Sequence, residues 1–245
     1  MEDNYSRSTP DSIFSRNEAV SSRSRSFLAS VFTYMFVALG ITAVVAYLFA
    51  GNPAQYIAPI LSNKLLFYAI VFAPLGFVLL MSFAFNRLSA PVLMALLLVY
   101  SAINGISFSF ILLTYTATSV FGCFLTAALM FGVMAVMGYT TKQDLTSMGR
   151  IMMMGLIGII IASIVNIFLG SNTMGYIISF IGVIVFTGLT AYDVQKLKRI
   201  GEGIDQEGNV IAGDVKKLAI MGALSLYLDF INLFLMLLRL FGRRN

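Results

Sequence analysis

Long apolar stretches separated by short polar ones make up most of this chain. Seven of the apolar stretches reach the roughly 17 to 25 residues that a helix needs to cross a hydrocarbon core. Prolines, glycines or charged residues end them. The pattern therefore predicts an all-α integral membrane protein, with a single transmembrane domain over 26–245. The predicted spans are about 27–49, 65–85, 91–113, 120–137, 151–169, 174–194 and 218–238.

The first 25 residues differ in composition from the rest. They are rich in Ser and charge and contain no apolar core of a signal peptide, which predicts a disordered cytoplasmic tail over 1–25. With seven spans, most Lys and Arg residues fall on the side of this tail, as expected for a cytoplasmic N-terminus. Arg239, Arg243 and Arg244 fit this orientation badly. An alternative therefore stays open, in which the last segment re-enters the membrane instead of crossing it.

Composition narrows the class of protein further. Hydrophobic residues make up 59% and charged residues 11% of the chain, whereas soluble domains carry about a quarter charged residues. The formal charge of +5 comes from basic clusters beside apolar runs, which indicates membrane orientation and no nucleic-acid binding. The single cysteine, Cys123, allows no intrachain disulfide, and histidine is absent. A response to neutral pH would then have to come from carboxyl groups.

Two acids lie inside predicted spans, Asp229 near the middle of 218–238 and Asp193 near the end of 174–194. An aspartate at the centre of a membrane helix costs about 2.5 to 3.5 kcal/mol, so it normally faces the bundle interior and has a partner. At about 100° per residue, the polar and small residues of each helix gather with the acid on one face. We predict that these two faces pack together and that the last helix is central, enclosed by the other six. The residues that share the acids' faces are Gly222, Ser225 and Asn232 on the last helix, and Ser179, Gly182 and Thr190 on the one before it.

Asp193 also has a simpler interpretation, because Lys196 lies three residues later and could pair with it at the membrane interface. The spacing raises a question of depth as well. Asp229 lies about 18 Å along its helix from Lys217, whereas Asp193 lies only about 4 to 5 Å from Lys196. For the acids to meet, either the basic run 196–199 lies in a protein-lined cavity or the last helix begins outside the membrane. Sequence spacing leaves both open.

The segments AYDVQKLK (191–198) and GALSLYLDFINLFLMLLRLFG (222–242) resemble the signature of the Bax inhibitor family, the transmembrane Bax-inhibitor-motif proteins and their bacterial relatives. This resemblance implies a bundle in which six helices surround the last one. It also implies a pH-sensitive calcium leak gated by an aspartate pair, which corresponds here to Asp193 and Asp229. Arg87, in FAFNRLS, is similarly placed to an arginine that can latch the closed state. A glutamate that some relatives carry in the second helix has no counterpart between 65 and 85.

The physical chemistry of two buried carboxyl groups is consistent with such a gate. Within hydrogen-bond reach in a low dielectric they cannot easily both ionise, so the closed pair would share a proton. Losing that proton would separate the helices and offer carboxylate oxygens as a weak, transient calcium site. We therefore expect a calcium (cation) leak channel in a bacterial inner membrane. Its partners would be the lipid bilayer, calcium and protons, with no tightly bound cofactor and no enzymatic activity.

Two other functions deserve comparison. Two membrane aspartates also form intramembrane aspartyl proteases, but those enzymes place a Gly-x-Gly-Asp type sequence at the second acid. Here Leu226, Tyr227 and Leu228 precede Asp229, which disfavours a protease. The other alternative is a regulatory protein that binds a membrane protease or a cell-death partner through its tail. The sequence does not exclude this role, and it is compatible with a leak.

Overall fold

The computed structural model describes residues 10–206 and 212–245, and within this part of the chain all regular elements are helices. Their order along the chain is α1 (Pro10–Gly51), α2 (Pro53–Tyr56), α3 (Ala58–Ser62), α4 (Lys64–Phe83), α5 (Ala90–Thr114), α6 (Ala117–Thr140), α7 (Thr146–Leu169), α8 (Asn172–Gln206) and α9 (Ala212–Phe241). Helices α1 and α4 to α9 are the seven that are long and apolar enough to span a membrane. The predicted fold class is therefore confirmed.

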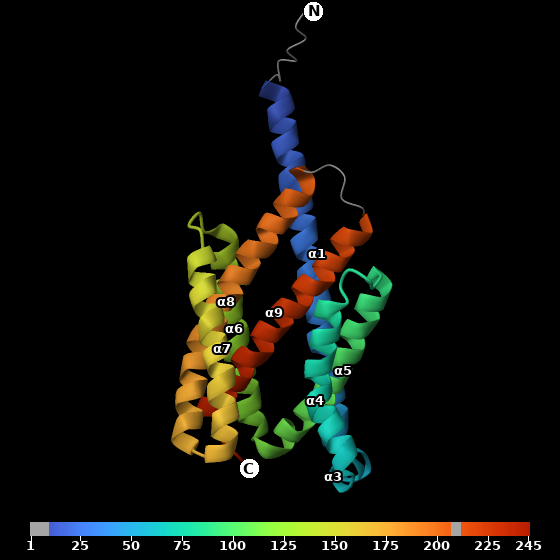
Figure 1. Cartoon of the computed structure of the whole chain (residues 1–245), viewed down its shortest axis with the longest axis vertical. Coiled ribbons are helices and arrows are strands. Elements are labelled where there is room, and N and C mark those ends of the chain that lie inside the picture. The colour runs from blue at the N-terminus through green and yellow to red at the C-terminus, as the bar shows by residue number, and fades with distance from the viewer. Residues whose placement is uncertain (1–9, 207–211) are drawn as a thin grey trace, which may run out of the picture.

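The seven long helices run up and down between two ends of the bundle (Figure 1). One end carries the start of α1, the end of α8 and the start of α9. The opposite end carries α3 and the C-terminus. Helix α9 is continuous over 30 residues, which corresponds to about 45 Å, and it passes from the first end to the second. The last segment thus crosses the bundle, and the re-entrant alternative does not describe this structure.

Short local signals end and begin the helices. The side chain of Asn63 caps α4 by accepting hydrogen bonds from the backbone N–H groups of Leu65 (3.1 Å) and Leu66 (3.2 Å). Pro91 lies in the first turn of α5, where its missing N–H is not needed. Gly170 ends α7 with a φ of 61°, a conformation that glycine adopts without strain. These signals match the short polar breaks of the sequence.

Helix α1 differs from the prediction for the N-terminal segment. The sequence favoured a disordered tail over 1–25, but the described helix begins at Pro10. Proline is well suited to the first helical turn, and extending an existing helix avoids the cost of nucleation. Residues 1–9 lie outside the described part of the chain.

Helix α9 is the most buried of the spanning helices. Of its most apolar stretch 61% is buried inside the bundle, against 6% for α4 and α7. Its main packing partners are α1, α5, α6 and α8, whereas α4 packs chiefly on α5 and α7 on α8. The structure therefore places α9 in the interior, but it does not confirm that all six other spans enclose it.

Glycines allow α8 to lie close to its neighbours. A Cβ atom at Gly138 of α6 would overlap the backbone of Ala191, and one at Gly149 of α7 would overlap the ring of Tyr192. On α9, a Cβ atom at Gly222 would lie 2.5 Å from the side chain of Leu197. Small residues let membrane helices approach closely, since dispersion contacts and hydrogen bonds hold them together in lipid. Helix α8 is thus fixed between α6, α7 and α9.

The segment after α9 folds back along the connection between α5 and α6. The N–H of Thr116 donates to the carbonyl oxygen of Arg243 (3.0 Å), and the N–H of Asn245 donates to that of Thr114 (3.0 Å). The N–H of Arg243 donates to the hydroxyl oxygen of Ser119 (3.0 Å). These bonds hold the last residues against the bundle end.

Candidate functional site

Asp229 lies in the interior of α9 and is only 5% exposed. Its Oδ2 atom is buried and has no hydrogen-bond partner among the described residues. Burying an ionised carboxylate without a partner is very costly, so such a group needs a proton or a cation. This requirement makes Asp229 the centre of the candidate site.

Asp193 faces α9 from α8. Its Oδ2 atom accepts a hydrogen bond from the hydroxyl of Ser225, which lies four residues before Asp229 on α9. Residues four apart share a helix face, so Asp229 lies on the side of α9 that faces α8. The two predicted polar faces therefore meet through the bond between Asp193 and Ser225.

A cavity of about 420 Å³ opens on this bond between α4, α8 and α9. Its polar lining comes from Ser82, Asp193, Lys196 and Ser225. Asp229 is not part of the lining and lies one helical turn beyond Ser225. Going inward from the cavity, the hydrogen-bonded Asp193 comes first and the buried Asp229 second.

The same geometry answers the question of depth. Lys196 lines the cavity together with Asp193, because α8 continues as a helix to Gln206 instead of ending near 194. Helix α9 begins at Ala212, before Lys217. The first condition left open by the sequence is thus met at Lys196, so the acids can lie on facing helix segments.

Two other polar residues of the predicted faces form hydrogen bonds within their own helices. The hydroxyl of Thr190 donates to the carbonyl oxygen of Phe186 (2.8 Å), and the amide of Asn232 donates to that of Leu228 (2.8 Å). Such bonds satisfy a polar side chain one turn back along its own helix. Ser225 alone of the three makes its hydrogen bond across the interface.

Arg87 lies apart from the aspartates in this structure. It is exposed in the turn after α4, does not line the cavity, and forms no ion pair with Asp193 or Asp229. The proposed latch therefore stays a prediction. Arg87→Ala tests it, since removal of a latch would raise the expected calcium leak at neutral pH.

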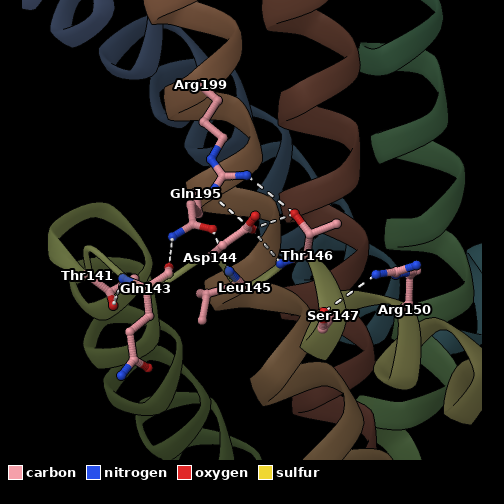
Figure 2. Close-up of polar contacts among 9 residues, drawn as sticks. All are labelled: Thr141, Gln143, Asp144, Leu145, Thr146, Ser147, Arg150, Gln195 and Arg199. Atoms are coloured by element: carbon pink, nitrogen blue, oxygen red, sulfur yellow. Dashed lines mark hydrogen bonds and ion pairs between the residues drawn. The ribbon is translucent and has the colours of Figure 1, made fainter.

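The loop between α6 and α7 holds the opposite face of α8 (Figure 2). The amide of Gln195 accepts from the N–H of Leu145 (2.9 Å) and donates to the carbonyl oxygen of Gln143 (2.7 Å). One turn further, Arg199 pairs with Asp144 at 2.9 Å. Because Gln195 is two residues from Asp193, it points away from it, and the loop fixes the rotation of α8 that turns Asp193 toward α9.

Asp144 in this loop stays ionised over most of the pH scale. The hydroxyl of Thr146, with its N–H and then Arg199, lowers the pKa of Asp144 to about 2. The Thr146 hydroxyl and N–H donate to Oδ1 at 2.6 Å and 2.9 Å. A proton-dependent change near neutral pH therefore does not come from this acid.

A second buried polar cluster joins α1, α5 and α9, and the sequence analysis missed it. The hydroxyl of Thr42 donates to the carbonyl oxygen of Ser101 (2.9 Å) and lies 2.8 Å from the hydroxyl of Tyr227, which can donate to it in turn. Asn104 is 8% exposed, and its Nδ2 has no partner among the described residues. The polar residues inside the third predicted span, such as Ser101 and Asn104, were a signal for this cluster, whereas nothing distinguished Thr42 from Thr33 in the first span.

The described residues offer no cluster of three or more His, Cys, Asp or Glu side chains that could hold a metal ion. Two aspartates supply at most four carboxylate oxygens, and calcium takes six to eight oxygen ligands. Any calcium ion at this site would need water or carbonyl oxygens as well, and would bind weakly.

Seven spanning helices, with an aspartate buried in the last and a second aspartate beside a cavity, define a polytopic α-helical membrane protein. The model of the family described as "Inhibitor of apoptosis-promoting Bax1" matches residues 24–245. The chain belongs to this family.

Relatives come from several bacteria. The chain is 45% identical over 221 residues to the inner membrane protein YbhL of Escherichia coli strain K12, which covers 90% of this chain and 93% of the relative. It is 40% identical over 233 residues to protein RP147 of Rickettsia prowazekii, covering 94% and 95%. A membrane protein of Streptococcus pyogenes serotype M1 is 38% identical over 220 residues, covering 89% and 93%. The similarity thus extends over nearly the whole chain.

Proposed function

We propose that this protein is a pH-sensitive calcium (cation) leak channel gated by Asp193 and Asp229. The observation that carries the proposal is the carboxyl group of Asp229, which is 5% exposed, has an Oδ2 with no hydrogen-bond partner among the described residues, and lies next to a cavity that contains Asp193. A purely structural polar residue would be hydrogen-bonded at this depth. An unpartnered acid beside a second acid is instead suited to exchange a proton for a cation.

In the closed state one proton is held by the pair. Two carboxylates without a proton between them would repel in the low-dielectric interior. The packed interface of α8 and α9, with the bond from Ser225 to Asp193, corresponds to this state. Lys196 is the other charged side chain among the described residues that line the cavity.

The open state forms when the pair loses its proton. Repulsion then separates α8 from α9, and the cavity extends toward Asp229. A cation entering it would meet carboxylate oxygens and the hydroxyls of Ser82 and Ser225, which line the cavity now. Weak binding at such a site permits conduction, because a tightly bound ion would not leave.

The experiment is calcium flux into liposomes that contain only the purified protein, measured over a pH series. We expect flux that rises with pH. Liposomes that contain the Asp193→Asn/Asp229→Asn double variant are the matched control. Flux no greater than in protein-free liposomes at any pH would reject the channel and favour the regulatory role with a membrane-protein partner.

The proposal includes a cellular setting. The chain would lie in a bacterial inner membrane with its N-terminus in the cytoplasm, which agrees with the distribution of Lys and Arg and with the name of the relative from Escherichia coli. It assigns no catalytic step and no tightly bound cofactor to the protein. The two aspartates bind and release protons and cations only.

A further inference from the structure

An apolar crevice that shares no lining residue with the aspartate cavity lies toward the end of the bundle that carries the C-terminus. It has a volume of about 350 Å³ and is lined by α1, α5, α6 and α9. Phe230 and Phe234 of α9 contribute to its lining, with Phe108 of α5 and Phe124 of α6 beside them. The volume lies within the range of about 300 to 1,000 Å³ that is usual for ligand sites.

The crevice offers a ligand almost no polar contacts. Thr42 and Tyr47 are the only lining residues with polar side-chain atoms. The hydroxyl of Thr42 is already bonded to Ser101 and Tyr227, and Tyr47 is 76% exposed at the rim. A ligand that enters between these helices must therefore be a hydrocarbon over most of its length.

The crevice opens toward the lipid. Helices α1 and α5 pack extensively together, α6 lies on the other side, and α9 lies between them (Figure 1). Ala43 of α1 and Phe124 of α6 both line the crevice and are exposed on the membrane surface of the bundle. Acyl chains are the molecules present at this surface, so an acyl chain is the ligand that the opening admits.

Positive charge lies at the end of the crevice where α5 and α6 meet. Leu112 of α5 and Val120 of α6 belong to its lining, and the connection between these helices carries the segment that follows α9. The guanidinium group of Arg244 lies 5.9 Å from the ring centre of Tyr115, three residues after Leu112. Neither Arg243 nor Arg244 forms an ion pair with a described residue, and no acid lies in 113–122.

We propose that this crevice binds one acyl chain of an anionic phospholipid, whose phosphate lies against Arg243 and Arg244. Arginine presents several donors to a phosphate in a fixed geometry. The backbone hydrogen bonds from 243–245 to the connection between α5 and α6 hold these arginines at the bundle end. An anionic headgroup would thus meet the arginines and an apolar chain the crevice. The site does not depend on the proposed channel activity.

The test is native mass spectrometry of the purified full chain in a mixture of phosphatidylglycerol and phosphatidylcholine with identical chains. We expect preferential retention of one phosphatidylglycerol molecule. The Arg243→Ala/Arg244→Ala variant should lower this preference by about 30-fold, or about 2 kcal/mol for two basic residues near a lipid phosphate. The matched control is Lys142→Ala/Arg150→Ala, which removes two exposed charges outside this crevice.

A second pair of variants tests the chain-binding part. Ala43→Phe places a ring in the crevice and should abolish retention of both lipids, whereas Val44→Phe adds the same ring at a neighbouring exposed position that does not line it. Two results would overturn the proposal. One is equal retention of the two lipids by the parent protein, and the other is unchanged retention in Ala43→Phe.

Discussion

The hydroxyl of Ser225 on α9 donates a hydrogen bond to the carboxylate of Asp193 on α8, across 32 positions of sequence. The bond gives one acid of the site a neutral donor and leaves the other acid, Asp229, with an oxygen that has no described partner. The two acids are therefore not equivalent. Asp193 contacts the cavity and is hydrogen-bonded, and Asp229 lies beyond it in the interior.

If the proposed leak exists, neutralising the aspartates should remove its pH response. We expect Asp229→Asn and Asp193→Asn each to lose most of the pH dependence of calcium flux, because a coupled titration belongs to the pair. The double variant should be no more sensitive to pH than either single variant, since removal of either acid already breaks the coupling. Liposome flux assays between about pH 5 and 9 measure this pH dependence. The chain contains no histidine, so no histidine can account for a response in this range. A double variant with the full pH profile would place the sensor elsewhere.

The control for that experiment is an acid outside the membrane spans. The pKa of Asp144 is lowered from 3.8 to about 2, first by the hydroxyl of Thr146. Its ionised form and its pairing with Arg199 therefore persist above about pH 4 and are lost only as the pH falls through about 2. We expect Asp144→Asn to leave the pH profile of calcium flux unchanged across the neutral range. A shifted profile would mean that the loop between α6 and α7 takes part in gating.

Removing the hydroxyl of Ser225 should destabilise the packing of α8 on α9. Ser225→Ala leaves a partly buried carboxylate oxygen of Asp193 without its donor, at an expected cost of about 1 to 3 kcal/mol. Thr126→Ala is the matched control, because the hydroxyl of Thr126 is exposed and bonds only to its own helix at Gly122 (2.9 Å). Thermal unfolding of the purified variants in detergent measures the difference. Equal midpoints for both variants would contradict the assigned role of Ser225.

Two glycines of α6 should respond in opposite directions to substitution by alanine. Gly138→Ala places a methyl group against the backbone of Ala191 and should destabilise the bundle by about 1 to 3 kcal/mol. Gly122→Ala meets nothing within 4 Å and should stabilise α6 by about 0.5 to 1 kcal/mol through its higher helix propensity. Thermal unfolding of the two variants side by side checks the sign of each effect.

Labelling of introduced cysteines tests the proposed orientation. In a background with Cys123→Ala, we expect Lys142→Cys to be protected from a membrane-impermeant thiol reagent added to intact cells, and Asn245→Cys to be labelled. Both positions are exposed. Lys142 belongs to the connection between α6 and α7, which lies at the opposite end of the bundle from the C-terminus (Figure 1). Labelling of Lys142→Cys with protection of Asn245→Cys would reverse the orientation.

The spans and the polar faces could be predicted because each depends on one local property. Length and hydropathy define a spanning helix, and the period of the helix places Ser225 on the same face as Asp229. The true end of α8 could not be predicted in this way. Charges at 196–199 resemble the end of a span, yet Lys196 lines a cavity formed by three helices, and only the tertiary fold creates that cavity.

The partners of individual side chains were also beyond the sequence. Thr190, Ser225 and Asn232 looked equivalent, but two of them bond to their own helices and one bonds to Asp193. The choice depends on how closely α8 and α9 approach, which glycines such as Gly222 determine. The role of Thr42 could not be predicted because its hydrogen-bond partners, Ser101 and Tyr227, are far from it in the sequence and belong to two other helices.

Helix α4 lines the cavity, and its position depends on the thickness of the bilayer. With 20 residues it is about 30 Å long, close to the hydrocarbon thickness, whereas α9 is half as long again. It contributes Val78 and Ser82 to the cavity lining, but it packs chiefly on α5. Hydrophobic mismatch costs a fraction of a kcal/mol per Å and is relieved by tilting. Lipids with shorter chains would therefore tilt α4 before the core helices, and a thinner membrane would alter access to Asp193.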